Sequence, residues 1–338
     1  MTPGELNAFG EEKVRTLITG IGGFAGSHLA DYLLAQTNWQ IVGCVLSECD
    51  IPTHLADRVT CYAVDLRDPE AVQRMLETTA PDVIFHLAAL ARVGDSWQNP
   101  WPVLHNNIRA QLNLLHALVQ LGATPRVMVV GSNEEYGLVK PQDLPLDEAH
   151  PLQPNSPYGV SKVTQDMLGL QYYLSYQLPI VRVRPFNHIG PRQAPGFVAP
   201  DFARQIAAAE IGQPGSATRR PPLMQVGNLE AQRDFTDVRD MVRAYYLAVT
   251  QGEPGQVYNL GSGQAHAIQE LLDVLLSYST VEINVEPDPS RMRPSDVPVV
   301  RCDATKFHAL TGWTPQISFE TSLRDVLDYW RAQMREEK

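Results

Sequence analysis

The segment VRTLITGIGGFAG, residues 14–26, decides the fold. Residues 14–19 are an apolar run of the length of a buried strand, and glycines follow at positions 20, 23 and 26. Residues 27–35 then repeat apolar side chains with helical spacing. A strand, a glycine turn and a helix in this order are typical of a nucleotide-binding unit, because small residues let the helix N-terminus approach a pyrophosphate. A glycine turn that binds no ligand is the alternative.

Strand and helix patterns continue to alternate after this first unit, which predicts an α/β fold with a Rossmann-type doubly wound parallel sheet. Strands are expected at residues 40–46, 83–89, 126–131 and 181–184. Helices are expected at residues 68–78, 106–121 and 158–176. Residues 237–250 and 257–261 again have the pattern of a helix followed by a buried strand.

Changes in composition divide the chain. Residues 1–12 are polar and are expected to form a flexible tail, and residues 13–185 form mainly the NAD(P)-binding Rossmann domain. After residue 185 the sequence becomes loop-like and richer in Gly, Pro and Arg. We therefore expect a smaller C-terminal substrate lobe in residues 186–338, with residues 234–263 returning to the Rossmann domain.

Composition excludes several classes of function. The 338 residues are 44% hydrophobic and 19% charged, and their net charge of −11 argues against binding to nucleic acid. An anionic ligand would then need a local basic pocket. We find no apolar run long enough for a bilayer and no His/Cys cluster for a metal. The spacing of the four cysteines predicts free thiols and a cytoplasmic protein: Cys44, Cys49, Cys61 and Cys302.

The segment SPYGVSK, residues 156–162, points to hydride-transfer chemistry. Tyr158 and Lys162 are four positions apart on one helical face, so the ammonium is expected to lower the pKa of the phenol. Ser132 would stand at the carboxyl end of a strand, where open sheets bind ligands, and its hydroxyl can bond a substrate carbonyl. A serine there is otherwise a common turn former. The three side chains together predict a catalytic site.

Cofactor contacts are expected along the same edge of the sheet. Ser47 and Glu48 end the second strand without an adjacent arginine for a 2′-phosphate, which favours NAD over NADP. The other candidates surround the pyrophosphate, the adenine end and the path between them: Gly20, Gly23, Phe24, Ala25, Gly26, Asp65, Leu66, Leu87, Ala88 and Ala89. Asn107, Tyr158 and Lys162 are cofactor-binding candidates as well, and Lys162 is expected to bind the nicotinamide ribose. For residues 87–89, sheet core is an equally good interpretation.

The glycine loop, the HLAA segment at 86–89, Ser132 and the Tyr158–Lys162 pair resemble the extended short-chain dehydrogenase/reductase family. Within that family, three segments resemble enzymes that act on GDP-sugars: RPFNHIGPRQ (184–193), VGNLEAQRDFTDVRD (226–240) and RMRPSDVP (291–298). The resemblance implies that Ser132, Tyr158 and Lys162 are catalytic.

The same resemblance implies ligand-binding roles for residues outside the catalytic group. Around the diphosphate of the sugar nucleotide it places Asn187, Arg233 and Arg293, and Val198 is a further substrate contact. Without the resemblance, Arg233 and Arg293 would each be better interpreted as a solvated surface residue. Asn107 resembles a family asparagine that supports the active-site backbone, although an ordinary polar helix residue fits nearly as well.

The implied activity is NAD(P)H-dependent reduction of the C4 keto group of GDP-4-keto-6-deoxy-D-mannose to GDP-D-rhamnose. A GDP-mannose 4,6-dehydratase, in which Glu134 would be catalytic, and another nucleotide-sugar 4-reductase or epimerase are the alternatives. A further alternative is a nucleotide sensor without catalytic activity, but the presence of Ser132, Tyr158 and Lys162 argues against it. The apolar faces of the helices at 106–121 and 158–176 predict a homodimer.

Overall fold

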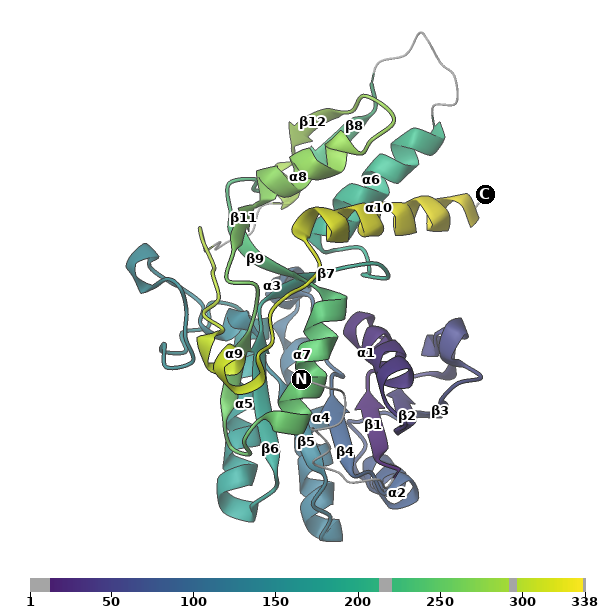
Figure 1. Ribbon diagram of the computed structural model, residues 1–338, viewed down its shortest axis with the longest axis vertical. Coiled ribbons are helices and arrows are strands. Elements are labelled where there is room, and N and C mark those ends of the chain that lie inside the picture. Colours follow the sequence, from purple (N-terminus) through teal and green to yellow (C-terminus); the bar gives the residue numbers. More distant parts are fainter. Residues whose placement is uncertain (1–12, 213–220, 292–296, 337–338) are drawn as a thin grey trace.

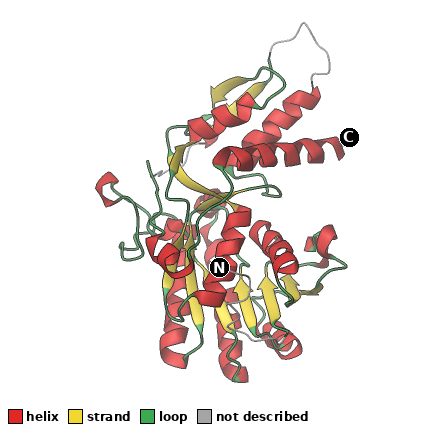
Figure 2. Ribbon diagram, viewed as in Figure 1, coloured by secondary structure: helices red, strands yellow, loops and turns green. Residues whose placement is uncertain are grey.

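The computed structural model describes residues 13–212, 221–291 and 297–336. The tail predicted at residues 1–12 and the predicted ligand contact Arg293 lie outside the described residues. Two lobes are evident, a larger one built on a central sheet and a smaller one that lies against one end of it (Figure 1). Helices enclose the central sheet in the larger lobe, whereas short strands and helices make up the smaller one (Figure 2).

The large lobe contains a seven-stranded sheet in the order β10-β6-β5-β4-β1-β2-β3. Every neighbouring pair is parallel. The predicted doubly wound parallel sheet is therefore confirmed, with the strand order of a Rossmann fold. The strands are β1 (Arg15–Thr19), β2 (Gln40–Val45), β3 (Thr60–Ala63), β4 (Val83–His86), β5 (Arg126–Val130), β6 (Ile180–Pro185) and β10 (Val257–Leu260).

Helices cover both faces of this sheet, as parallel strands require. One buried apolar cluster joins the sheet to α1, α7 and α9, and a second joins it to α2, α4 and α5. The two clusters fix the helices that carry the site residues. The helices are α1 (Phe24–Gln36), α2 (Pro69–Thr79), α3 (Val93–Gln98), α4 (Pro100–Leu121), α5 (Pro157–Tyr176), α7 (Val238–Gln251) and α9 (Thr305–Thr311).

Several helices begin earlier than the apolar pattern predicted. Helix α1 starts at Phe24 rather than at residue 27, so its first turn lies inside the glycine loop. Helix α4 starts at Pro100 rather than at residue 106, because proline suits the first turn, where no amide hydrogen is needed. Helix α5 starts at Pro157, and the Ser156 hydroxyl accepts a hydrogen bond from the Gly159 amide at 3.0 Å.

The small lobe has two short sheets, in the orders β11-β9-β7 and β12-β8. Three helices pack on them around a separate apolar core. Within residues 234–263, β9 belongs to the small lobe, while α7 and β10 belong to the large one. The elements are β7 (Asn187–Ile189), β8 (Leu223–Val226), β9 (Gln232–Asp237), β11 (Ala265–Ala267), β12 (Asn284–Pro287), α6 (Val198–Gly212), α8 (Ile268–Ser277) and α10 (Phe319–Glu336).

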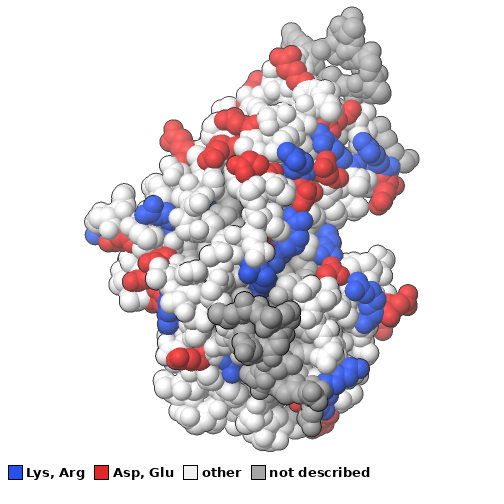
Figure 3. Space-filling view, in the orientation of Figure 1, with Lys and Arg blue, Asp and Glu red and all other residues white. Residues whose placement is uncertain are grey.

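The junction of the lobes lies at the carboxyl ends of the parallel strands. A pocket there is lined by residues that follow β5 and by residues of the small lobe, including Arg233 of β9. In the view of Figure 3, Lys and Arg side chains gather along this junction, although the chain has a net charge of −11. Among the described residues that line the pocket, the charged side chains are Arg233 and Glu134. Among the described residues, we find no helix with the length and apolarity to span a bilayer.

Candidate active site

The glycine loop between β1 and α1 is shaped for a pyrophosphate. A Cβ atom on Gly26 would lie 2.2 Å from the Gly20 carbonyl oxygen, so only glycine permits this close turn. Among the described residues, no side chain caps the first turn of α1, and that turn contains no acid. Its amide hydrogens therefore stay available for an anion, which the helix dipole favours. The loop fits the predicted role of Gly20, Gly23, Phe24, Ala25 and Gly26.

The remaining predicted cofactor residues follow neighbouring strands of the same sheet edge. Ser47 follows β2, and its amide donates to the Asp50 carboxylate at 3.0 Å. Asp65 follows β3 and forms an ion pair with Arg67 at 2.7 Å, which lowers the pKa of Asp65. The amides of Leu87 and Ala88 donate to the Thr19 carbonyl and hydroxyl, each at 3.2 Å. Leu66 and Ala89 adjoin these residues. These predicted cofactor residues extend along the carboxyl edge of the large sheet, away from the catalytic residues.

Ser132, Tyr158 and Lys162 come together where β5 ends and α5 begins. All three are buried, with exposed fractions of 7%, 8% and 4%. The Lys162 ammonium donates to the Val130 carbonyl at 2.9 Å and lies 5.9 Å from the centre of the Tyr158 ring. The Ser132 hydroxyl accepts from the Glu134 amide at 3.2 Å and is also hydrogen-bonded to the Tyr158 phenol. The structure thus assembles the predicted catalytic group.

The pKa of Tyr158 differs from the sequence-based expectation. Burial raises this pKa, the charge of Glu134 raises it further, and a hydrogen bond with Ser132 opposes both effects. The Lys162 ammonium donates to the Val130 carbonyl rather than to the phenol, and the pKa of Tyr158 lies above its ordinary value instead of below it. Burial also lowers the pKa of Lys162 to about 8. Tyr158 is therefore a neutral phenol near neutral pH, which suits a proton donor.

Asn107 supports the site from α4 and is fully buried. Its amide group donates to the Leu90 carbonyl at 3.1 Å and to the Ser161 hydroxyl at 3.0 Å. Its side-chain oxygen accepts from the Leu90 amide at 2.8 Å. Asn107 thus ties the loop after β4 to helix α5, next to Lys162. These contacts are those of a supporting residue rather than of an ordinary polar residue on a helix.

The pocket at the lobe junction contains acidic, basic and aromatic side chains. Glu134 and Arg233 line it together with Trp97 of α3. Sequence reasoning did not identify Trp97. A signal was present, since the segment that contains Trp97 follows β4 at the carboxyl edge of the sheet, where open α/β sheets bind ligands. Other lining residues that were not foreseen are Val93, Asn133, Gly137, Asn155, Ser156, Val297 and Val300.

The structure separates the predicted substrate contacts. Arg233 lines the pocket, and its guanidinium donates to the Val297 carbonyl at 2.7 Å. Asn187 begins β7, and its side-chain oxygen is buried and has no hydrogen-bond partner among the described residues. Val198 begins α6 and packs against the core of the small lobe. Arg233 and Asn187 thus have polar atoms suited to a ligand, whereas Val198 makes apolar contacts.

The match to a family model decides the relationship of this chain. The model of the GDP-mannose 4,6 dehydratase family matches residues 17–326. The chain belongs to this family. The match spans both lobes. The predicted resemblance to GDP-sugar enzymes of the extended short-chain dehydrogenase/reductase family is confirmed.

Individual relatives of this GDP-mannose 4,6-dehydratase family member include reductases and more distant epimerases. A GDP-6-deoxy-D-mannose reductase of Pseudomonas aeruginosa is 36% identical over 96% of this chain and 99% of the relative. The structure of RMD from Pseudomonas aeruginosa complexed with NADPH covers 94% of this chain and 99% of its own, with 33% identity and a TM-score of 0.81. A UDP-glucose 4-epimerase of Thermus thermophilus in complex with NAD has 30% identity, the same TM-score and the same coverage.

Proposed function

We propose that this NAD(P)-dependent oxidoreductase reduces the C4 keto group of GDP-4-keto-6-deoxy-D-mannose to GDP-D-rhamnose, with NADH or NADPH. The observation that carries this proposal is the convergence of Ser132, Tyr158 and Lys162 at the end of β5. The resemblance to a reductase along almost the whole chain supports the choice of substrate. Arg233 in the adjoining pocket supports binding of an anionic sugar nucleotide.

The reaction adds one hydride and one proton to a carbonyl. A nicotinamide cofactor held at the glycine loop and the start of α1 would supply the hydride. Ser132 donates its hydroxyl hydrogen to the carbonyl oxygen and stabilises the negative charge that develops there. Tyr158 then gives its phenolic proton to the same oxygen, which completes the alcohol. Lys162 keeps a positive charge beside the phenolate that remains, and this charge favours the loss of the proton.

A GDP-mannose 4,6-dehydratase is the second candidate, and Glu134 favours it. This carboxylate lines the same pocket as Arg233, and its charge acts on Tyr158. A carboxylate in that place is suited to removing a proton from the carbon next to a keto group. The two candidates differ in their use of cofactor, since a dehydratase returns its hydride within one cycle whereas a reductase consumes reduced cofactor.

Absorbance of the reduced cofactor distinguishes these candidates. The purified protein would receive GDP-4-keto-6-deoxy-D-mannose with NADH or NADPH, and a parallel sample would receive GDP-mannose alone. The proposal predicts loss of one reduced cofactor for each keto sugar converted, and the comparison of NADH with NADPH gives the preference. Conversion of GDP-mannose to the keto sugar without net loss of cofactor would instead establish the dehydratase.

We also propose a homodimer through α4 and α5. Three exposed apolar residues of α5, Val160, Met167 and Leu174, are spaced by seven and so lie along one face, and Leu112 is exposed on α4. Such a row is typical of a helix face that packs against another helix. Met167→Asp should give monomers in sedimentation at micromolar concentration, whereas Leu223→Asp on β8 should leave dimers. A monomeric wild-type protein would contradict the proposal.

We infer a cytoplasmic location on chemical grounds. The four cysteines are free, and two of them, Cys44 and Cys302, are buried. Free thiols are typical of proteins that work in a reducing compartment. Fractionation of cells that express the tagged protein would test this inference, and recovery outside the cytoplasmic fraction would contradict it.

A further inference from the structure

A buried acid lies directly behind Ser132. Glu135 ends the short helix η3 (Asn133–Glu135) and is fully buried. Its Oε1 atom accepts a hydrogen bond from the Ser132 amide at 2.8 Å. A Cβ atom on Gly131 would lie 2.1 Å from this Oε1, so glycine at that position leaves the space that the carboxyl group fills. The acid therefore holds the backbone of the catalytic serine.

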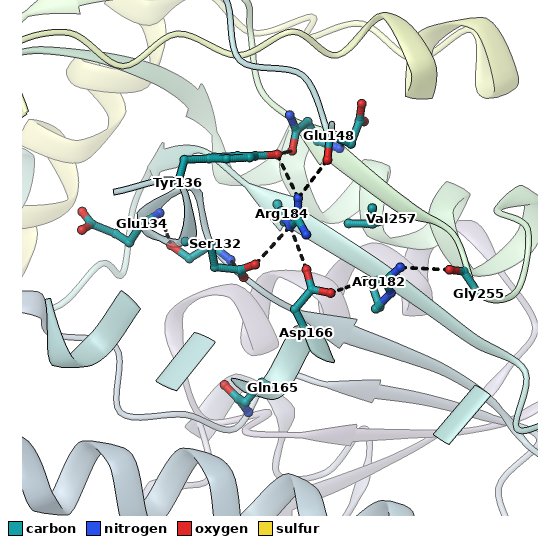
Figure 4. Close-up of polar contacts among 12 residues, drawn as sticks. Ser132, Glu134, Tyr136, Glu148, Gln165, Asp166, Arg182, Arg184, Gly255 and Val257 are labelled. Carbon is teal, nitrogen blue, oxygen red and sulfur yellow. Dashed lines mark hydrogen bonds and ion pairs between the residues drawn. The ribbon is translucent and has the colours of Figure 1, made fainter. Parts of the chain in front are cut away.

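A second acid and two arginines complete the cluster, which Figure 4 shows. Asp166 lies on α5, one turn after Lys162, and only 1% of it is exposed. Arg184 of β6 has its Nε atom 2.7 Å from Asp166 and 3.0 Å from Glu135 Oε2. Arg182 also pairs with Asp166 and donates to the Gly255 carbonyl. The cluster thus joins η3, α5 and β6.

The arrangement of this cluster leaves one carboxylate oxygen without a hydrogen-bond donor among the described residues. The Nε atom of Arg184 carries a single hydrogen, which is donated to Asp166. Glu135 Oε2 then has no hydrogen-bond donor among the described residues, although it is fully buried. A buried carboxylate oxygen without a donor is costly. A proton on this oxygen removes the cost, because a neutral carboxyl group can donate to the Asp166 carboxylate.

The surrounding charges agree with this assignment. Burial and the charge of Asp166 raise the pKa of Glu135 well above its usual value, while Arg184 opposes them. Arg184 and Arg182 outweigh burial and lower the pKa of Asp166. Lys162 and Tyr158, both on α5, also face the cluster, and a charge on Glu135 would raise the pKa of each. A neutral Glu135 avoids this effect on the catalytic pair.

We propose that Glu135 is a positioning residue for Ser132, a neutral acid that shares its proton with Asp166 and thereby fixes the serine relative to the tyrosine on α5. The link runs from the Ser132 amide through the two carboxyl groups to the helix that carries Tyr158 and Lys162. It rests on the proposed ketoreduction, in which the serine hydroxyl and the phenol act on one oxygen atom. A small displacement between them would slow turnover more than it weakens binding.

Substitutions at two positions separate positioning from stability. Glu135→Gln keeps an oxygen for the Ser132 amide and an N–H group for Asp166, so it should retain most of the turnover. Glu135→Leu removes both contacts and should lower kcat by ~10–100-fold at nearly unchanged KM. In Gly131→Ala the added Cβ atom would displace the Glu135 carboxyl group, so this variant should lower kcat similarly. It replaces the leucine variant in the test if the leucine variant does not fold.

Tyr136→Phe is the matched control. The Tyr136 hydroxyl donates to Asn259 at 2.6 Å and accepts from Arg184 at 3.2 Å, so it belongs to the same cluster without touching the serine. This variant should lower Tm and leave kcat within about twofold. If the leucine and alanine variants lowered Tm but kept the wild-type kcat, Glu135 would be only structural and the proposal would be overturned.

The protonation of Glu135 has a readout that does not depend on turnover. Infrared spectra should contain a band of a buried protonated carboxyl group that shifts in D₂O and is missing in Glu135→Gln. Absence of that band in the wild type, or a glutamine variant as slow as the leucine variant, would overturn the proposal. Activity of the wild type on the keto sugar is measured first, so failure of the ketoreductase function would be recognised separately.

Discussion

Replacement of Tyr158 by phenylalanine removes the proposed proton donor and little else. Tyr158 is 8% exposed and lies in the first turn of α5, so the phenylalanine ring should occupy the same place. Loss of one buried hydroxyl should change the free energy of unfolding by ~1 kcal/mol. Loss of the acid should lower kcat by ~10²–10⁴-fold, which corresponds to about 3–5 kcal/mol of transition-state stabilisation. Binding of the GDP-sugar should be nearly unchanged.

The assay is steady-state loss of reduced cofactor, with calorimetry for sugar-nucleotide binding. Tyr245→Phe is the control, because Tyr245 of α7 is also a buried phenol, with 1% exposed, and lies close enough for electrostatic interaction with Tyr158. That variant should keep kcat within about threefold. Tyr158 would not be the proton donor if Tyr158→Phe turned over at a rate near wild type, or if both variants lost activity equally.

Three further perturbations address the neighbourhood of the site. Lys162 is protonated below a pKa of about 8 and neutral above it, so kcat should fall as the pH rises through about 8, and a flat profile would contradict this. Asp234→Ala leaves three backbone amides and a hydroxyl without their acceptor. Urea unfolding should show that the free energy of unfolding falls by ~3–5 kcal/mol, and a fall of less than ~1 kcal/mol would contradict this. Asn107→Leu should lower kcat and Tm together, and wild-type values of both would exclude its supporting role.

The sheet of the large lobe was predictable because its signals are local. Each buried strand is a short apolar run, and each covering helix has its own apolar spacing, so the alternation is visible without knowledge of tertiary contacts. The starts of α1, α4 and α5 were missed by one to several residues, since glycine and proline there look like breaks in a pattern. At a helix start they are favourable.

The small lobe could not be derived in the same way. Strands β7 and β11 each have three residues and pair with β9, which lies far from β7 in the sequence. Three residues carry too little periodicity to distinguish a strand from a loop. The segment after residue 185 was therefore interpreted as a loop, although it begins the small sheet.

The catalytic residues were predictable by type and spacing, but their electrostatics were not. The distance of four positions placed Tyr158 and Lys162 together, whereas the direction of the lysine depends on the Val130 carbonyl, which only the folded chain brings near. Glu135 was invisible for a similar reason. Two successive acids at a turn indicate a solvated loop, and the burial of the second is explained only by Asp166 and Arg184 from other elements.

The central claim is hydride transfer to C4 of a GDP-4-keto sugar with net use of cofactor. The most direct measurement supplies GDP-4-keto-6-deoxy-D-mannose with a reduced cofactor deuterated at the transferred position and analyses the product by NMR. A C4 ketoreductase should give GDP-D-rhamnose with deuterium at C4, and one oxidised cofactor for each molecule of product. Deuterium at C4 of a sugar with the opposite configuration would correct the product. Unlabelled sugar with no net oxidation of cofactor would contradict the account.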